Sequence, residues 1–172
     1  LDLESLDYFP RLLTDLPKSS ENNKTFYFEL RDDIKWDNGE QFTAEDVAFS
    51  TKIMLCHLTN NSQIRPIYNS VIKSVTLDPT NPLKFSMDAQ DINWTAKTIL
   101  GGIYMQQKSY WDPNGLFDNI TFDQILDRSF KETDELSNWF NDFNHADNGY
   151  KPENLKGLGP YFVSEWEPSQ YV

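Results

Sequence analysis

The chain has 172 residues, of which 38% are hydrophobic and 15% are aromatic, and its formal net charge at pH 7 is −12. This length suits one domain with a proper core and is short for two. The aromatic content argues against a disordered acidic chain, and the negative charge disfavours binding to phosphate backbones and anionic membrane surfaces. We therefore expect one folded domain over residues 1–172 and no nucleic-acid partner.

Signals for membranes and disulfides are weak in this sequence. It contains no run of about 18 apolar residues, so we expect no direct membrane insertion. The acidic start, LDLESLDYF, lacks the basic and apolar regions of a signal peptide. The single cysteine, Cys56, cannot form an internal disulfide and leaves the redox compartment undecided.

The N-terminal part leads into an aromatic strand. Leucines within 1–16 are compatible with a short helix broken by Pro10, and residues 18–24 are polar and rich in turn formers. Apolar and other residues then alternate over Thr25–Arg31. This alternation predicts a half-buried strand whose aromatic face carries Phe26 and Phe28.

Two turns follow the predicted strand. Asp32-Asp33 ends it, and Ile34 and Trp36 continue the two-residue period as far as Asp37-Asn38-Gly39. Side chains of the Asp-Asn pair can bond their own backbone, and the glycine can adopt a positive φ.

A capped helix comes next. Thr43 and Asp46 have the spacing of a capping box, and the acidic pair Glu45-Asp46 suits the positive end of a helix dipole. We expect a helix from Ala44 to about Leu58. Its apolar positions leave only a narrow polar stripe, which predicts that the helix is mostly buried.

The middle of the chain predicts a loop, a hairpin and a helix. Pro66 lies in a loop over 63–68, and Val71–Asp78 and Leu83–Met87 are two strands joined by a proline-rich turn. Asp91 or Asn93 can cap a helix that ends at about Leu100, before two glycines.

Shorter elements are expected toward the C-terminus. Two are helices, Phe122–Asp127 and Ser137–Phe143, with Ser137 as the cap of the second. The other expected segments are a loop over 108–115, a loop over 146–155 and a closing strand over Tyr161–Trp166. Helices and strands intermix, so the fold class is α+β with a mixed, largely antiparallel sheet and flanking helices.

The sequence offers few groups for metal or nucleotide chemistry. Cys56, His57 and His145 are too few and too scattered for a zinc site, and a core cysteine beside a surface histidine explains the first two. The phosphate-binding glycine motifs are not found. We expect no cofactor and no metal.

Paired acids raise the possibility of acid/base catalysis. Asp32-Asp33 and Glu45-Asp46 could in principle act as glycosidase carboxylates. Both pairs have local explanations, the first as a turn and the second as a helix cap. We therefore expect no catalytic residues and no enzyme.

Two motifs carry a family resemblance. Phe26–Ser50 has an aromatic strand, Leu-Arg, a turn ending in Trp, Asn-Gly and Thr-Ala-Glu-Asp-Val, and Gly157–Pro168 reads GLGPYFVSEWEP. In this order they resemble the family 5 extracellular solute-binding proteins, the peptide- and nickel-binding components of ABC importers. Two departures are Asp33, where glycine is usual and which can adopt the left-handed conformation, and Leu158 in place of threonine.

The resemblance implies a fold, a location and partners. The chain would be a partial N-terminal lobe of a periplasmic-binding-protein-like (type II) architecture, with the second lobe absent. The longer protein would capture a peptide or small solute by closure of its two lobes and deliver it to ABC transporter permease subunits. It would act in the periplasm or on the extracellular face of the cytoplasmic membrane, where a lipid anchor is one means of attachment.

One residue is a candidate for solute binding. We expect the loop over 60–68 to face the cleft between the lobes, with Tyr68 supplying an aromatic face and a hydroxyl. The competing interpretation is that Tyr68 packs on the core of its own domain.

Two alternatives come from other classes of protein. A stand-alone carbohydrate- or protein-binding module would need several tryptophans exposed in one patch, the candidates being Trp94, Trp111, Trp139 and Trp166. An acid/base hydrolase would need two carboxylates that converge in a cleft.

Overall fold

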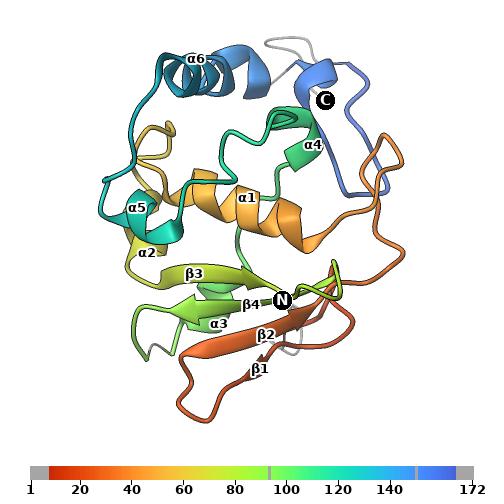
Figure 1. Cartoon of the computed structure of the whole chain (residues 1–172). Coiled ribbons are helices and arrows are strands. Elements are labelled where there is room, and N and C mark those ends of the chain that lie inside the picture. The colour runs from red at the N-terminus through yellow and green to blue at the C-terminus, as the bar shows by residue number, and fades with distance from the viewer. Residues whose placement is uncertain (1–7, 93, 150, 166–172) are drawn as a thin grey trace.

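A four-stranded antiparallel sheet lies at the base of the molecule in Figure 1, which shows a computed structural model of the chain. The structure describes residues 8–92, 94–149 and 151–165. The strand order is β1-β2-β4-β3. The strands are β1 Lys18–Ser19, β2 Thr25–Glu29, β3 Ile72–Leu77 and β4 Lys84–Ala89.

One face of the sheet is apolar. Phe26 and Phe28 of β2 pair with Met87 and Phe85 of β4, and all four side chains are buried. The rings of Phe28 and Phe85 stack with centroids 4.8 Å apart. The opposite face carries Tyr27, which is exposed, so the sheet has one core face and one polar face.

Helix α1 (Ala44–Leu55) covers the apolar face, and α4 and α6 lie above it in Figure 1. Nine of its side chains are buried, as the sequence predicts for a helix with a narrow polar stripe. The other helices are α2 Arg65–Asn69, α3 Ala96–Leu100, α4 Lys108–Trp111, α5 Phe122–Leu126, α6 Asp134–Phe143, and the 3-10 turns η1 Ala146–Gly149 and η2 Pro152–Asn154.

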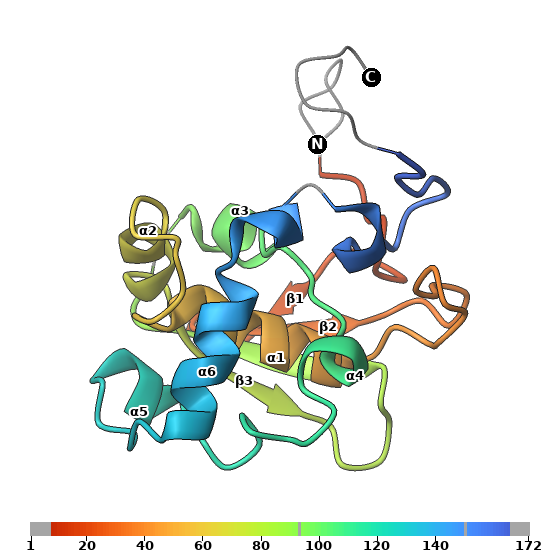
Figure 2. The same ribbon diagram turned by 90° about the horizontal axis from the view of Figure 1, so that it is seen from above.

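Aromatic rings hold α6 to the rest of the core. Trp139 stacks on Phe143 with centroids 4.8 Å apart, and it meets Phe117 edge-on at the same distance. Phe117 in turn contacts Phe49 of α1, with centroids 5.5 Å apart. Helix α6, which lies over α1 in Figure 2, is therefore joined to α1 both through the loop that carries Phe117 and directly, since the rings of Trp139 and Phe49 meet edge-on with centroids 6.2 Å apart.

Most of the helices and strands that short sequence patterns predict are confirmed. The aromatic strand, the hairpin of β3 and β4, and the helices at α1, α3 and α5 all form. Gly39 has φ +86°, as the predicted turn requires. The strand β1 was not predicted, because two polar residues give no period and it forms by pairing with β2.

Several predicted boundaries are wrong at the two ends of the chain. Residues 8–17 form no helix, and Leu13 pairs with Leu30 as an isolated bridge. Residues 161–165 form no strand, since no neighbouring strand pairs with them, and Trp166 lies outside the described residues.

Helix signals were also missed or misplaced. The predicted loop over 63–68 contains α2, which has proline at its start, a position that helices favour. The loop over 108–115 begins with α4. Helix α6 starts three residues earlier than expected because Thr133, not Ser137, accepts the capping bond, from the amide of Leu136. Thr95 precedes α3 as its N-cap, and Asn93 lies outside the described residues.

No helix in the described ranges is both long and apolar enough to cross a membrane.

The cap of α1 generates a stability prediction. Asp46 accepts the Thr43 amide at 2.9 Å and is only 5% exposed, whereas the Thr43 hydroxyl reaches it at 3.4 Å. We expect Thr43→Ala to lower the unfolding free energy by about 1 kcal/mol. Asp46→Ala should lower it by about 3 kcal/mol, because several buried donors lose their acceptor.

Urea unfolding measures both changes. Asp123→Ala is the matched control, since Asp123 is an exposed acid in the first turn of α5 and its loss should cost within about 0.5 kcal/mol. A loss for Asp46→Ala no greater than that for Thr43→Ala would contradict this assignment.

Candidate functional site

The buried carboxylate of Asp46 is the centre of a hydrogen-bond network. One oxygen, Oδ2, accepts from the Thr43 amide at 2.9 Å and the Trp36 indole N–H at 3.3 Å. The other oxygen, Oδ1, accepts from the backbone amide of Lys108 at 2.8 Å. Asp46 therefore joins the predicted turn, the predicted helix cap and a segment more than sixty residues later in the chain.

The segment before α4 is held at two further points. The Gln106 amide donates to the Ser50 hydroxyl at 2.7 Å, and the Gln107 side chain donates to the Glu40 carboxylate at 2.8 Å. Glu40 also accepts from the Ser109 hydroxyl. These contacts fix the segment over 106–109 against the first sequence motif.

The second motif lies directly against the first. The Asp37 amide donates to the carbonyl of Gly157 at 3.0 Å, and Leu158 packs on the hydrophobic core. The start of the second stretch is thus in contact with a turn of the first, although the two are far apart in the sequence.

The two acid pairs take part in local structure. Asp33 pairs with Arg31 on the surface, and the hydrogen bond from Arg31 lowers the pKa of the Asp33 carboxyl. The expected left-handed conformation of Asp33 is wrong: its φ is not positive. Asp46 is occupied by structural donors and Glu45 faces solvent, so neither pair supplies converging carboxylates in a cleft.

The cysteine and histidines do not gather around a metal. Within the described ranges no three His, Cys, Asp or Glu side chains are placed to hold an ion. Cys56 is buried, and burial raises the pKa of its thiol. The expected surface position of His57 is wrong: it is half-buried, packs against Phe130, and has Nε2 3.3 Å from a carboxylate oxygen of Glu132.

Tyr68 lies on α2 with its ring half-buried against the core. Its hydroxyl donates to the carbonyl of Gly102 at 2.8 Å, and burial raises the pKa of the phenol. The hydroxyl keeps its acceptor capacity, while its proton is used within the domain. Tyr104, nearby, is 71% exposed.

The tryptophans within the described residues do not form an exposed patch. Trp94 is 95% exposed, but Trp111 and Trp139 pack against the core, and the Trp139 indole donates to the Trp111 carbonyl at 2.5 Å. Trp166 lies outside the described residues. The aromatic-module alternative, which needs several tryptophans in one patch, finds no support in the described part of the chain.

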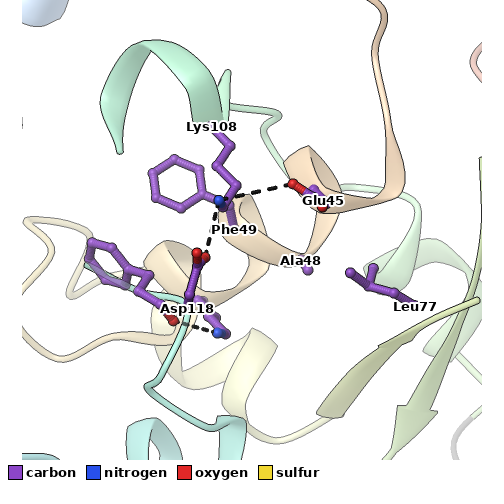
Figure 3. A pocket seen from close by; sticks show the side chains of 8 residues that line it. Glu45, Ala48, Phe49, Leu77, Lys108 and Asp118 are labelled. Atoms are coloured by element: carbon purple, nitrogen blue, oxygen red, sulfur yellow. Dashed lines mark hydrogen bonds and ion pairs between the residues drawn. The ribbon is translucent and has the colours of Figure 1, made fainter. Parts of the chain in front are cut away.

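A hollow that the sequence did not predict opens beside α1 (Figure 3). Its volume is about 290 Å³, and Glu45, Ala48 and Lys52 lie along one side of it. The three residues are spaced three and four apart, so they share one side of α1; Glu45 and Lys52 are polar, and Ala48 between them is one of the small residues of the helix. The facing wall comes from β3, α4 and the loop after α4, and its residues are Leu77, Lys108, Phe117 and Asp118.

The two lysines of the hollow differ in their partners. Figure 3 shows Lys108 between two carboxylates, 3.1 Å from Asp118 and 4.0 Å from Glu45. Burial lowers the pKa of Lys108, but the bond and charge of Asp118 outweigh it, so the net shift is upward. Lys52 instead donates to the Phe117 carbonyl at 2.6 Å, and burial lowers its pKa despite the nearby charge of Asp118.

A larger cavity of about 530 Å³ lies between the sheet, α1, α3 and residues 8–17. Its walls are mostly apolar, with Phe28, Phe85 and Met105 among them. Tyr8, Arg11 and Lys97 are the titratable residues among those that line it, and the Tyr8 hydroxyl is hydrogen-bonded to the Thr98 hydroxyl.

Comparison with known proteins identifies the family. The model of the bacterial extracellular solute-binding proteins, family 5 Middle, matches residues 7–172. The chain belongs to this family. It is a family of solute-binding proteins, not of enzymes, and its members are described as extracellular. No curated protein matches the chain.

Solved structures agree on the fold. The oligopeptide-binding protein AppA from Bacillus subtilis, in complex with a nonapeptide, is 17% identical with a TM-score of 0.65, and the match covers 97% of this chain and 27% of AppA. NikZ from Campylobacter jejuni, in complex with Ni(L-His), is 24% identical with a TM-score of 0.60, over 92% of this chain and 25% of NikZ.

A third match is MoaA from A. tumefaciens in complex with mannopinic acid, 18% identical with a TM-score of 0.58, over 93% of this chain and 25% of MoaA. The chain therefore spans about a quarter of the length of these proteins. Its α+β fold is part of a type II periplasmic-binding-protein-like architecture, as predicted.

The partly buried Lys52 generates a pH prediction. Its folded-state pKa lies below the ordinary value of 10.5, so between these two values the unfolded chain binds more protons than the folded chain. Stability attributable to Lys52 therefore rises with pH across this window. We expect the unfolding free energy of the wild type, relative to Lys52→Met, to increase from neutral pH toward 10.5.

Urea unfolding of the wild type and Lys52→Met across this pH range measures the difference between their unfolding free energies. Groups that titrate in the same way in both proteins do not contribute to that difference. A difference that stays constant or falls as the pH rises would show that Lys52 is not desolvated in the folded state.

Proposed function

We propose that the chain is part of the substrate-binding component of an ABC importer, which captures peptides or similar small solutes outside the cytoplasmic membrane. The observation that carries this proposal is the family match over residues 7–172 together with the joined pair of motifs. Permease subunits of the importer are the proposed partners, and the location is the periplasm or the extracellular face of the membrane, with a lipid anchor as one means of attachment.

The chain acts in this proposal as one part of a two-lobed protein. It covers about a quarter of the structures that it matches, so most of a solute-binding cleft would come from the rest of the longer protein. A site enclosed between two lobes that close on the ligand suits capture of a small solute. The chain itself is a single domain in this arrangement, since one core cluster runs through its sheet and helices.

An absence of catalysis is part of the proposal. The acids that could have served as an acid/base pair are used elsewhere, Asp46 as an acceptor for three backbone or indole N–H groups and Asp33 as the partner of Arg31. A protein that binds a solute without converting it needs no side chain whose pKa is shifted for proton transfer.

We propose Tyr68 as the contribution of this chain to the solute site. The half-buried ring is held by its bond to Gly102, so it can offer an ordered aromatic edge at small entropic cost. Ile67 on α2 and Ile64 at its N-cap are also exposed and extend the same surface.

In the longer protein, Tyr68→Ala should weaken peptide binding by about three- to tenfold, the range expected for one lost aromatic contact. Tyr68→Phe keeps the ring and should bind nearly as the wild type does. Isothermal titration with a peptide mixture measures the affinity, and the identity of the peptides that the protein retains gives the ligand class.

Tyr27→Ala is the control, because Tyr27 is exposed on the outer face of the sheet. An affinity unchanged by Tyr68→Ala would remove Tyr68 from the site. A longer protein that retains no peptide or small solute would overturn the proposed function itself.

A further inference from the structure

The hollow beside α1 combines two lysines and two carboxylates with an apolar wall. Ala48 and Leu77 line it together with the buried rings of Phe49 and Phe117. Its volume of about 290 Å³ is roughly ten times the share of liquid volume that one water takes. This is room for a molecule of a few carbon atoms with a polar end.

Lys52 is the polar group that this molecule would meet. Among the ion pairs of the described residues, Lys108 takes both carboxylates of the hollow and Lys52 takes neither. The Lys52 ammonium donates to the Phe117 carbonyl and lies 5.8 Å from the ring centroid of Phe122. An ammonium has three donors, so it can accept a further anionic partner.

The position of Lys52 on α1 favours a ligand that lies along the helix. Lys52 and Ala48 are four residues apart, so they are neighbours on the same side of α1 and both line the hollow. Leu77, from the end of β3, faces Ala48 across the hollow in Figure 3. A ligand with its anionic group on Lys52 would then place its alkyl chain between Ala48 and Leu77.

We propose that this hollow binds a small monocarboxylate with a short alkyl chain, its carboxylate on Lys52 and its chain between Ala48 and Leu77. A hydrogen bond between an ammonium and a carboxylate is about twice as strong as a neutral one, and the alkyl chain adds burial of apolar area. Eight residues of this chain line the hollow, and Tyr68 is not among them, so the proposal does not rest on the solute site proposed above.

The test uses the 172-residue chain and pentanoate as the probe, with pentanamide as the uncharged probe of the same shape. Methyl and amide NMR shifts during titration report both the affinity and the place of binding. We expect saturable shifts at Ala48 and Leu77 with pentanoate, and weaker binding of pentanamide by about tenfold or more, the cost of a lost charged hydrogen bond.

Two substitutions separate charge from structure. Lys52→Met should weaken pentanoate binding by about tenfold or more. Its control, Lys73→Met, removes an exposed lysine on β3 and should leave the affinity unchanged. Glu45→Gln removes a repelling carboxylate from the rim and should tighten binding by about two- to fivefold.

The control for Glu45→Gln is Glu135→Gln, since both acids are exposed in the first turn of a helix. This pair keeps the test decisive if Lys52→Met does not fold. Four results would each overturn the proposal. In the first two, pentanamide binds as tightly as pentanoate, or a folded Lys52→Met keeps the wild-type affinity for pentanoate. In the others, Glu45→Gln does not bind more tightly, or the shifts are confined to Met87 and Met105 of the larger cavity.

Discussion

The buried carboxylate of Asp46 is the constraint on which the rest of the structure depends. A charge that is 5% exposed is costly unless donors surround it, and three N–H groups do so here, from Trp36, Thr43 and Lys108. These donors come from a turn, a helix cap and a distant segment. Satisfying one carboxylate therefore fixes the first motif and the start of α4 in a single arrangement.

This constraint decides which acids are available for function. Asp46 is buried and already accepts from three N–H groups of the domain, so the most conspicuous acidic stretch of the chain serves as a scaffold. The polar stripe of the same helix remains, and it faces a hollow because Lys108, placed by its amide on Asp46, and Asp118 form the opposite wall. The network thus positions a site that it does not itself line.

The sequence predicted the elements whose signals lie close together in the chain. The cap at Thr43, the turn at Gly39 and the hairpin of β3 and β4 each have signals within a few residues. Two errors were local, because the signals that start α2 and α6, Pro66 and Thr133, were not recognised. Long-range partners explain the others. Strand β1 forms by pairing with β2, and the bonds from Asp46 to Lys108 and from Asp37 to Gly157 join segments whose proximity no local pattern encodes. The hollow was missed for the same reason, since only its α1 side lies in one stretch.

The central claim is that Asp46 joins the two distant segments as one cooperative unit. Native-state amide hydrogen exchange tests it most directly, through the Lys108 and Thr43 amides that share this carboxylate. We predict that both amides exchange only with opening of the whole domain and show the same protection, and that Asp46→Ala exposes both. A Lys108 amide that exchanges like an exposed loop while the Thr43 amide stays protected would contradict the account.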